Sequence, residues 1–284
     1  MSLLCRVLCV SRQGYYKWLR NRDRPYKHAL LLAWIMGILE EDPENANYGS
    51  IRMHEALLLK HENVPSEPTV RRVMRENGLI HKKKRNPQSL TKADKEAQAS
   101  DDLLKRDFSA QEPDKKWVTD ITQLPTADGK LYISSIFDCF DNHVMGLCMD
   151  DNMRAQLCVR TLRQAMGLYH AKGVILHSDR GSQYTSEEFR VCVKDLGVVQ
   201  SMNSAGGRCH DNAKCESMWA RFKEELIYGK IDTAKMPLAA VKALVWRYFF
   251  GYWNNRRICS AIGGLPPAEK RRRFYAAQQL PLAA

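Results

Sequence analysis

The hydrophobic pattern of this chain changes period after Trp117, and this change limits the folds that the chain can adopt. Three strand-like runs follow, WVTDITQLP, KLYISSIFDCF and HVMGLCMDD, separated by turn signals such as Asp128-Gly129 and Asp141-Asn142. Helical and strand-like segments then alternate: RAQLCVRTLRQAMGLYH, VILHSD, SEEFRVCVKDLG, VVQSM and NAKCESMWARFKEELIYG. Three antiparallel strands followed by alternating helices and strands predict an α/β fold, with a mixed five-stranded sheet flanked by helices.

Two aspartates stand where such a sheet would place a functional site. Asp120 lies in the middle of the first strand beside Trp117 and Val118, where a charge is costly unless it serves a site. Asp179 ends the fourth strand, so it either caps the following helix or lies at the open edge of the sheet, where ligands and metals bind. The right-handed crossover rule places the fourth strand beside the first, and we therefore expect the two carboxylates to be neighbours.

A third acid, Glu216, occupies the first turn of the helix predicted for NAKCESMWARFKEEL, and Lys223 lies two turns further on the same side. Taken alone, this helix is more typical of an exposed glutamate and an unrelated lysine. Three neighbouring carboxylates would need cations, and two Mg²⁺ or Mn²⁺ ions about 4 Å apart would suit phosphodiester displacement. His177, two residues before Asp179, either orients a nearby group or is a structural histidine.

Basic residues gather in the two flanks of the chain. Residues 1–100 carry 18 Lys and Arg against 11 Asp and Glu, and residues 217–284 carry 12 against 4. The middle, residues 101–216, carries 14 against 17. This distribution is typical of a protein that holds a polyanion with its flanks and processes it in the middle, although basic residues also serve solubility alone. Segment 71–95, with nine Lys or Arg, favours nucleic acid as the polyanion.

The amino-terminal part of the chain has helical patterns. Ser11 is typical of a helix start, and the two short helices around it have the size of a helix-turn-helix. In SEPTVRRVMRENGL, Ser66 is a candidate N-cap, Gly78 a candidate stop, and the apolar residues form one buried stripe. The basic residues outside this stripe form either an ordinary solvated face or a phosphate-contacting surface, and the adjoining basic run favours the second. The candidate DNA-binding residues are Arg71, Arg72, Arg75, Lys82, Lys83, Lys84 and Arg85.

The composition favours a cytoplasmic protein. No run in the 284 residues approaches the roughly 20 apolar residues that a membrane span needs. The first residues carry charges early and do not resemble a secretion signal. The nine cysteines include no CxxC pair, which indicates reduced thiols. We therefore expect no membrane partner.

The three acids and their neighbours resemble a known family. Asp120, Asp179 and Glu216, with 36 residues between the last two, look like the Asp-Asp-Glu signature of retroviral integrases and insertion-sequence transposases. HSDRGSQY, DNAKCES and YWNNRR are similar to segments in the second-reading-frame product of the large insertion-sequence family conventionally numbered three. CRVLCVSRQGYYKWL, YGSIRMHEALL and TVRRVMRENGL extend the resemblance over essentially the whole chain.

The resemblance implies a ribonuclease-H-like catalytic core behind helix-turn-helix modules, with the activity of a DNA transposase. Such an enzyme cleaves the ends of its element with divalent metal ions, and the freed 3′ hydroxyl then attacks another DNA strand. Asp120, Asp179 and Glu216 would hold two Mg²⁺ or Mn²⁺ ions, and Lys223 would contact the terminal DNA. Further candidates in the matching motifs are Arg256 and Arg257 for DNA contact and His177 and Asn212 as accessory residues.

The family also implies partners beyond double-stranded DNA. Its members usually act as a frameshift fusion with an upstream product, so this chain is expected to be the catalytic half, and two DNA ends require a homo-oligomer. We expect a bacterial, nucleoid-associated protein. Together the pattern and the resemblance predict five segments: a partial helix-turn-helix (1–25), a helical DNA-binding domain (26–85), a linker (86–112), the integrase core (113–230) and a helical basic extension (231–284).

Two departures from the family pattern accompany this prediction. The last spacing is 36 residues where relatives more often have 35, and Gly206-Gly207 makes the loop tolerant of the extra residue. Cys259 follows NNRRI where relatives frequently carry a histidine. The alternatives to a transposase are a domesticated DNA-binding protein without catalysis, which the presence of all three acids disfavours, and a nuclease of the same fold that cuts without joining strands.

Overall fold

A mixed five-stranded sheet forms the centre of the protein in the computed structural model, which describes residues 5, 7, 9–22, 25–80, 101–203 and 212–278. The strand order is β3-β2-β1-β4-β5. The first three strands pair in antiparallel fashion, whereas β4 lies parallel to β1 and β5 lies parallel to β4. The predicted sheet and the predicted neighbourhood of the first and fourth strands are confirmed. The strands are β1 (Lys116–Thr126), β2 (Gly129–Asp138), β3 (Val144–Asp150), β4 (Ile175–Ser178) and β5 (Val199–Met202).

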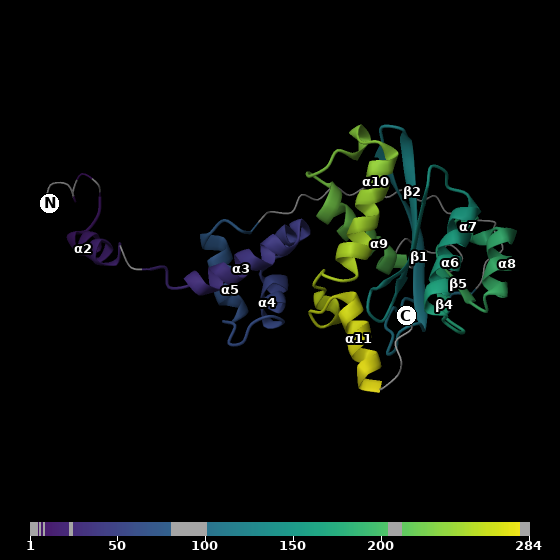
Figure 1. Cartoon of the computed structure of the whole chain (residues 1–284), viewed down its shortest axis with the longest axis horizontal. Helices are drawn as coiled ribbons and strands as arrows, with labels where there is room; N and C mark the ends of the chain where they lie inside the picture. The colour runs from purple at the N-terminus through teal and green to yellow at the C-terminus, as the bar shows by residue number, and fades with distance from the viewer. Residues whose placement is uncertain are drawn as a thin grey trace.

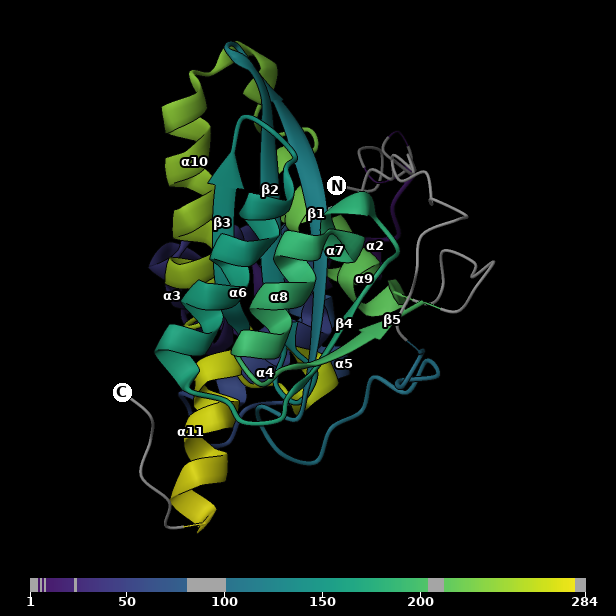
Figure 2. The same ribbon diagram turned by 90° about the vertical axis from the view of Figure 1, so that its right-hand side faces the viewer.

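Helices cover both faces of the sheet, as Figures 1 and 2 show. On one face lie α6 (Ala155–Tyr169), α7 (Ser182–Thr185) and α8 (Glu187–Asp195), and on the other lie α9 (Ala213–Phe222) and α10 (Leu238–Trp246). The backbone of α6 approaches β3 closely at Gly146, where an added Cβ would lie 2.6 Å from the carbonyl oxygen of Thr161. Only glycine permits this approach, and it brings the buried apolar residues of α6 onto the sheet.

Three further helices precede the sheet in the chain: α3 (Ala29–Glu41), α4 (Ser50–Leu58) and α5 (Glu67–Glu76), with a 3₁₀ turn, η1 (Pro43–Asn47). Ser66 is the N-cap residue of α5, and its predicted stripe of Val70, Val73 and Met74 is buried. The chain leaves this helix through Gly78, which has a φ of +68° that glycine adopts readily.

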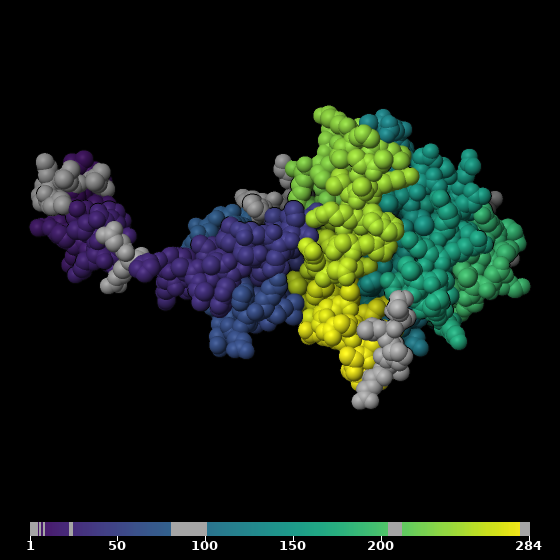
Figure 3. All heavy atoms as spheres, viewed as in Figure 1, coloured from purple at the N-terminus to yellow at the C-terminus, as the bar shows by residue number. Residues whose placement is uncertain are grey.

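The first helix with a complete description, α2 (Arg12–Asn21), stands apart from the rest of the protein in Figures 1 and 3. Ser11 caps it as predicted, because its side-chain oxygen accepts a hydrogen bond of 2.9 Å from the Gly14 N–H. None of its residues is buried. The helix expected before it includes residues that lie outside the described ones, as do residues 81–85 of the expected DNA-binding domain and residues 86–100 of the expected linker.

Helices α3, α4 and α5 share one hydrophobic core with the sheet and the carboxyl-terminal helices. The shared cluster contains Val73 of α5, Phe137 of β2, Trp219 of α9 and Phe249 of the segment after α10. The five segments expected from the sequence therefore include three that pack against one another, while their boundaries stay a prediction. The remaining elements are the π-helical segments η3 (Lys223–Ile227) and η5 (Arg247–Trp253), the 3₁₀ turns η4 (Thr233–Lys235) and η6 (Ser260–Ile262), and α11 (Pro267–Gln278).

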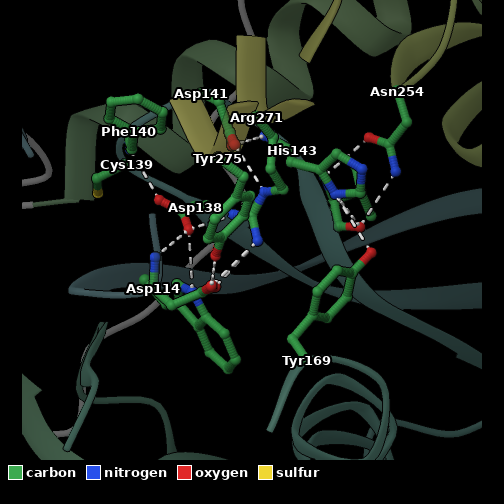
Figure 4. Close-up of polar contacts among 12 residues, drawn as sticks. Asp114, Asp138, Cys139, Phe140, Asp141, His143, Tyr169, Asn254, Arg271 and Tyr275 are labelled. Carbon is green, nitrogen blue, oxygen red and sulfur yellow. Dashed lines mark hydrogen bonds and ion pairs between the residues drawn. The ribbon is translucent and has the colours of Figure 1, made fainter. Parts of the chain in front are cut away.

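A buried arginine ties the last helix, α11, to the sheet. Figure 4 shows Arg271 among three carboxylates, with its Nη2 2.6 Å from Asp138 Oδ2, its Nε 2.8 Å from Asp141 Oδ2 and its Nη1 3.1 Å from Asp114 Oδ1. Burial and the neighbouring Asp141 raise the pKa of Asp138 to about 7, against the opposing effect of Arg271. Arg271 thus pairs with three carboxylates, and this member of the basic KRRRF segment stabilises the fold.

The described residues also bear on the expectations for membrane spans and cysteines. None of the helices there combines the length and the apolar character needed to cross a bilayer. All eight cysteines in those ranges are free thiols, as predicted.

Candidate active site

The two aspartates predicted to be neighbours lie at equivalent positions on adjacent parallel strands. The register of β1 and β4 pairs Val118 with His177. Asp120 and Asp179 each follow two residues later, so the same register places them opposite one another where β4 ends. Both line a pocket of about 380 Å³. Its other lining residues are Ile121, Thr122, Gln123, Tyr132, Met153, Gly181, Ser182, Gln183 and Tyr184.

The electrostatics of Asp120 bring the rest of the predicted site together. Burial raises the pKa of Asp120 to about 8, the charge of Asp179 adds to this rise, and Glu216 contributes less. Lys223 acts in the opposite direction and lowers it. Burial also raises the pKa of Asp179, while the Gly181 N–H, 2.9 Å from its Oδ1, lowers it. The three predicted acids and the predicted lysine therefore act on one point of the molecule.

Helix α9 carries the third acid. Its buried residues Cys215, Met218, Trp219 and Phe222 pack it on the sheet, and Glu216 lies off this stripe and is exposed. Lys223 follows where the helix passes into η3, and π-helical turns of this kind are frequent at functional sites. Burial lowers the pKa of Lys223, and Asp120 opposes this shift.

Asn212 fixes the start of α9 against the sheet beside the first aspartate. It is buried, and its Nδ2 donates a hydrogen bond of 3.1 Å to the carbonyl oxygen of Thr119, the residue before Asp120. Its Oδ1 is buried without a hydrogen-bond partner among the described residues. Asn212 therefore contacts the residue next to Asp120, and an accessory role for it stays a prediction.

His177 has the surroundings of a structural histidine. It is buried, with Nδ1 2.9 Å from Ser201 Oγ and Nε2 2.9 Å from Asn203 Oδ1. Its ring also meets Phe108 edge to face. Of the two alternatives that the sequence left open, these contacts favour a residue that holds β4 against β5.

The expected DNA-binding residues divide into three groups. Arg71, Arg72 and Arg75 are exposed on α5, although Arg71 pairs with Glu67 at 3.0 Å. The run Lys82, Lys83, Lys84 and Arg85 lies outside the described residues. Arg256 is exposed and lies 3.4 Å from Asp42.

Arg257, unlike Arg256, is not an exposed side chain, and its expected contact with DNA stays a prediction. Its guanidinium is buried, donates to both carboxylate oxygens of Glu225 at 2.7 and 2.8 Å, and stacks 4.4 Å from the Trp253 ring. Glu225 also accepts from Arg52 of α4 at 2.9 Å. Arg257 and Arg52 thus share one carboxylate, which joins the helical unit of α3, α4 and α5 to the core. The partner of Arg257, distant in the sequence, gave no signal in the YWNNRR motif.

The donor set suits hard divalent cations. Asp179 and Glu216 both raise the pKa of Asp120, so this group of acids needs positive charge nearby, and oxygen ligands of this kind select Mg²⁺ or Mn²⁺. Among the described residues, no three His, Cys, Asp or Glu side chains already form a group that could hold a metal ion. The residue types therefore fit a metal ion, and the assignment of all three acids as its ligands is a proposal.

The pocket residues Gln123, Tyr132 and Gln183 were missed by the sequence reasoning. They have no spacing or residue type that distinguishes them from ordinary strand and loop residues, and only the pairing of strands brings them beside Asp120 and Asp179. They are polar side chains that can contact a nucleic-acid substrate in the pocket.

A mixed five-stranded sheet with one aspartate on β1, another directly after the adjacent parallel strand β4 and a glutamate on the following helix α9 is an arrangement typical of polynucleotidyl transferases. Comparison with known families agrees, since the chain matches models of the integrase core domain over residues 110–207 and 197–267.

Relatives extend this match over the whole chain. The transposase InsF for insertion sequence IS3A of Escherichia coli (strain K12) is 32% identical over 95% of this chain and 93% of its own length. The transposase for insertion sequence element IS629 of Shigella sonnei is 30% identical over 96% of this chain and 92% of its own. Among solved structures, the catalytic core domain of BIV integrase superposes with a TM-score of 0.42 and 19% identity, over 58% of this chain and 99% of that one.

The chain belongs to the insertion-sequence transposases that carry an integrase core domain. It is accordingly a DNA transposase, an enzyme that acts on DNA and depends on divalent metal ions. The predicted family, fold and class of enzyme are confirmed.

Proposed function

We propose that this chain cleaves DNA at the ends of its insertion sequence and joins the freed ends to a target strand, with Asp120, Asp179 and Glu216 as the metal ligands. The observation that carries this proposal is the β1–β4 register, which sets Asp120 and Asp179 side by side in one pocket. Glu216 and Lys223, which both act on Asp120, support the assignment of the other two residues.

Two Mg²⁺ or Mn²⁺ ions bound there would supply Lewis-acid activation of an attacking oxygen and stabilisation of a leaving oxygen. Asp120 and Asp179 line the pocket, and Glu216 of α9 would supply the third carboxylate. In cleavage, a water oxygen bonds to the phosphorus and the bond from phosphorus to the 3′ oxygen breaks, which frees a 3′ hydroxyl. In joining, that 3′ oxygen bonds to a target phosphorus and displaces the target's own 3′ oxygen.

Lys223 binds the DNA next to this centre. Its ammonium is half-buried and close enough to Asp120 to shift the pKa of that residue, so a phosphate held by Lys223 would lie beside the reacting one. The exposed arginines of α5, the run Lys82 to Arg85 and Arg256 are proposed to hold the flanking duplex. Arg257 is not among these exposed surface contacts, because it is buried against Glu225.

The finer statements on partners belong to the same proposal. Two element ends must meet one target, so we propose a homo-oligomer on DNA. An upstream-frame product, as a fusion or a partner, would add further DNA contacts. Association with the nucleoid would follow from these contacts.

The test compares Asp120→Asn, Asp179→Asn and Glu216→Gln with the wild type in cleavage and joining of end DNA with Mg²⁺. Each variant should lose both reactions and keep its affinity for DNA, because removing a metal ligand leaves the basic surfaces intact. Asp195→Asn, the same change of charge at an exposed residue of α8, is the matched control and should react as the wild type. A ligand variant with the control's activity would remove that residue from the site.

A further inference from the structure

A second pocket, of about 280 Å³, lies between the helical unit and the catalytic core, away from the site described above. Its walls come from α4, from α9 and from the segment that follows η5. The lining residues used below are Arg52, Lys214, Ser217, Arg221, Arg257 and Ser260.

The walls of this pocket are strongly basic. Arg52, Lys214, Arg221 and Arg257 line it, and its lining contains no Asp or Glu. Two of these cations, Arg52 and Arg257, pair with the buried carboxylate of Glu225. Four cations against this one carboxylate leave a surplus of positive charge at the pocket.

The other two cations lack a compensating carboxylate. Lys214 Nζ donates to the backbone carbonyl of Cys139 at 2.9 Å, a contact that leaves its charge in place. Arg221 is exposed and has no ion pair within the described ranges. Glu55 lies near the rim, where it accepts a hydrogen bond of 2.7 Å from Ser260 Oγ, and it does not line the pocket.

The guanidinium groups of the pocket are held rigidly and keep donors to spare. Arg257 gives Nε and Nη2 to Glu225, and Arg52 gives Nη1 to Glu225 and Nη2 to the carbonyl of Asn47. Each guanidinium has five N–H donors, so these contacts leave N–H groups for a further acceptor. Ordered arginines with such donors are suited to phosphate oxygens.

The pocket and the active site lie on different faces of the same helix. Lys214, Ser217 and Arg221 of α9 follow one another at three- and four-residue spacing and therefore share one face. Glu216 and Lys223 are two turns apart on another face. Since a helix with its side chains is roughly 10 Å across, both faces lie within reach of one bound DNA molecule.

We propose that this pocket binds a backbone phosphate of the DNA on which the enzyme acts, as an anchor outside the active site. The proposal rests on the proposed function for the identity of the ligand. The anchor also explains why one wall comes from α4, because a phosphate held by Arg52 and by Arg221 bridges the helical unit and the catalytic core.

The test measures the affinity of the full chain for a labelled DNA duplex of arbitrary sequence over a range of salt concentrations. Arg221→Gln and Lys214→Gln should each weaken binding about tenfold and reduce the salt dependence by about one phosphate contact. Lys194→Gln, the same change of charge at an exposed residue of α8, is the control and should bind as the wild type. Arg221 is exposed, so its variant folds.

The outcomes separate the anchor from the proposed function. Variants that bind the duplex as the Lys194→Gln control does would overturn the anchor, while strand joining by the wild type would still support the proposed function. Failure of the wild type to bind the duplex would overturn both. A last experiment tests inorganic phosphate as the ligand. If phosphate raises the melting temperature of the wild type and not of Arg221→Gln, while both proteins bind the duplex equally, the pocket binds free phosphate and the DNA anchor is refuted.

Discussion

Replacing Arg271 with leucine leaves three carboxylates of the interior without their common cation. Asp138 and Asp141 are completely buried, and each lies within 2.8 Å of the guanidinium. Leucine keeps part of the apolar stem of the arginine, so the change removes mainly charge and hydrogen bonds.

The expected loss of stability follows from this geometry. Removing one partner of a buried ion pair costs about 3–5 kcal/mol, because the remaining charge stays desolvated. The loss of the guanidinium from its position 5.3 Å from the Tyr169 ring adds roughly 1 kcal/mol. Proton uptake by the carboxylates limits the total, since the pKa of Asp138 is already about 7. We therefore expect Arg271→Leu to lower the free energy of unfolding by about 4 kcal/mol at pH 7.

Urea denaturation of the full chain measures this loss, with Arg272→Leu as the control. Arg272 is the next residue on α11, is exposed and pairs only with Glu269 in the described structure, so its variant should be close to wild type. Without the guanidinium, the buried carboxylates of Arg271→Leu have raised pKa values, so the stability of this variant falls as the pH rises through those values. Its loss of stability relative to the wild type should therefore grow from pH 6 to pH 8. Equal stability of the two variants at pH 7 would refute the reasoning.

Three other predictions concern the interface, the pH response and the active site. Arg257→Gln should lower the free energy of unfolding by about 3 kcal/mol, because it removes one of the two arginines that pair with the buried Glu225 and leaves only Arg52. Arg256→Gln should leave stability unchanged and weaken DNA binding, and the reverse pattern would contradict the assignment. Burial lowers the pKa of His143 to about 3, so the protein folds with this histidine neutral. Its contribution to the free energy of unfolding is complete above the unfolded pKa of about 6.5 and is lost as the pH falls, by about 2 kcal/mol at pH 5. Denaturation at pH 7 and pH 5 should show this loss in the wild type and a smaller loss in His143→Gln. Lys223→Ala should reduce strand joining at saturating DNA, and full activity there would exclude it from the site.

The sheet and its two aspartates could be predicted from local pattern. Strand-like runs of alternating residues, turn signals and the crossover rule depend on neighbours in the sequence, and these fixed the positions of Asp120 and Asp179. The buried stripes of α5 and α6 follow from helical periodicity in the same way.

The ion pairs that join distant segments could not be predicted. Arg257 lies 32 residues from Glu225, and Arg271 lies 130 residues from Asp141. Both arginines stand in basic runs that are typical of DNA contact, and only the folded chain shows that their partners are buried acids. The composition of a basic run therefore predicts a surface segment, but tertiary packing determines which of its arginines are exposed.

The measurement that tests the account most directly is strand joining with a pre-cut element end, comparing the wild type with Glu216→Gln in Mg²⁺, in Mn²⁺ and in EDTA. The account predicts joined products from the wild type with either metal, none in EDTA, and none from Glu216→Gln in any condition, although both proteins bind the DNA. Products from Glu216→Gln at the wild-type level would contradict the three-carboxylate site and show that the 36-residue spacing has displaced the glutamate from it.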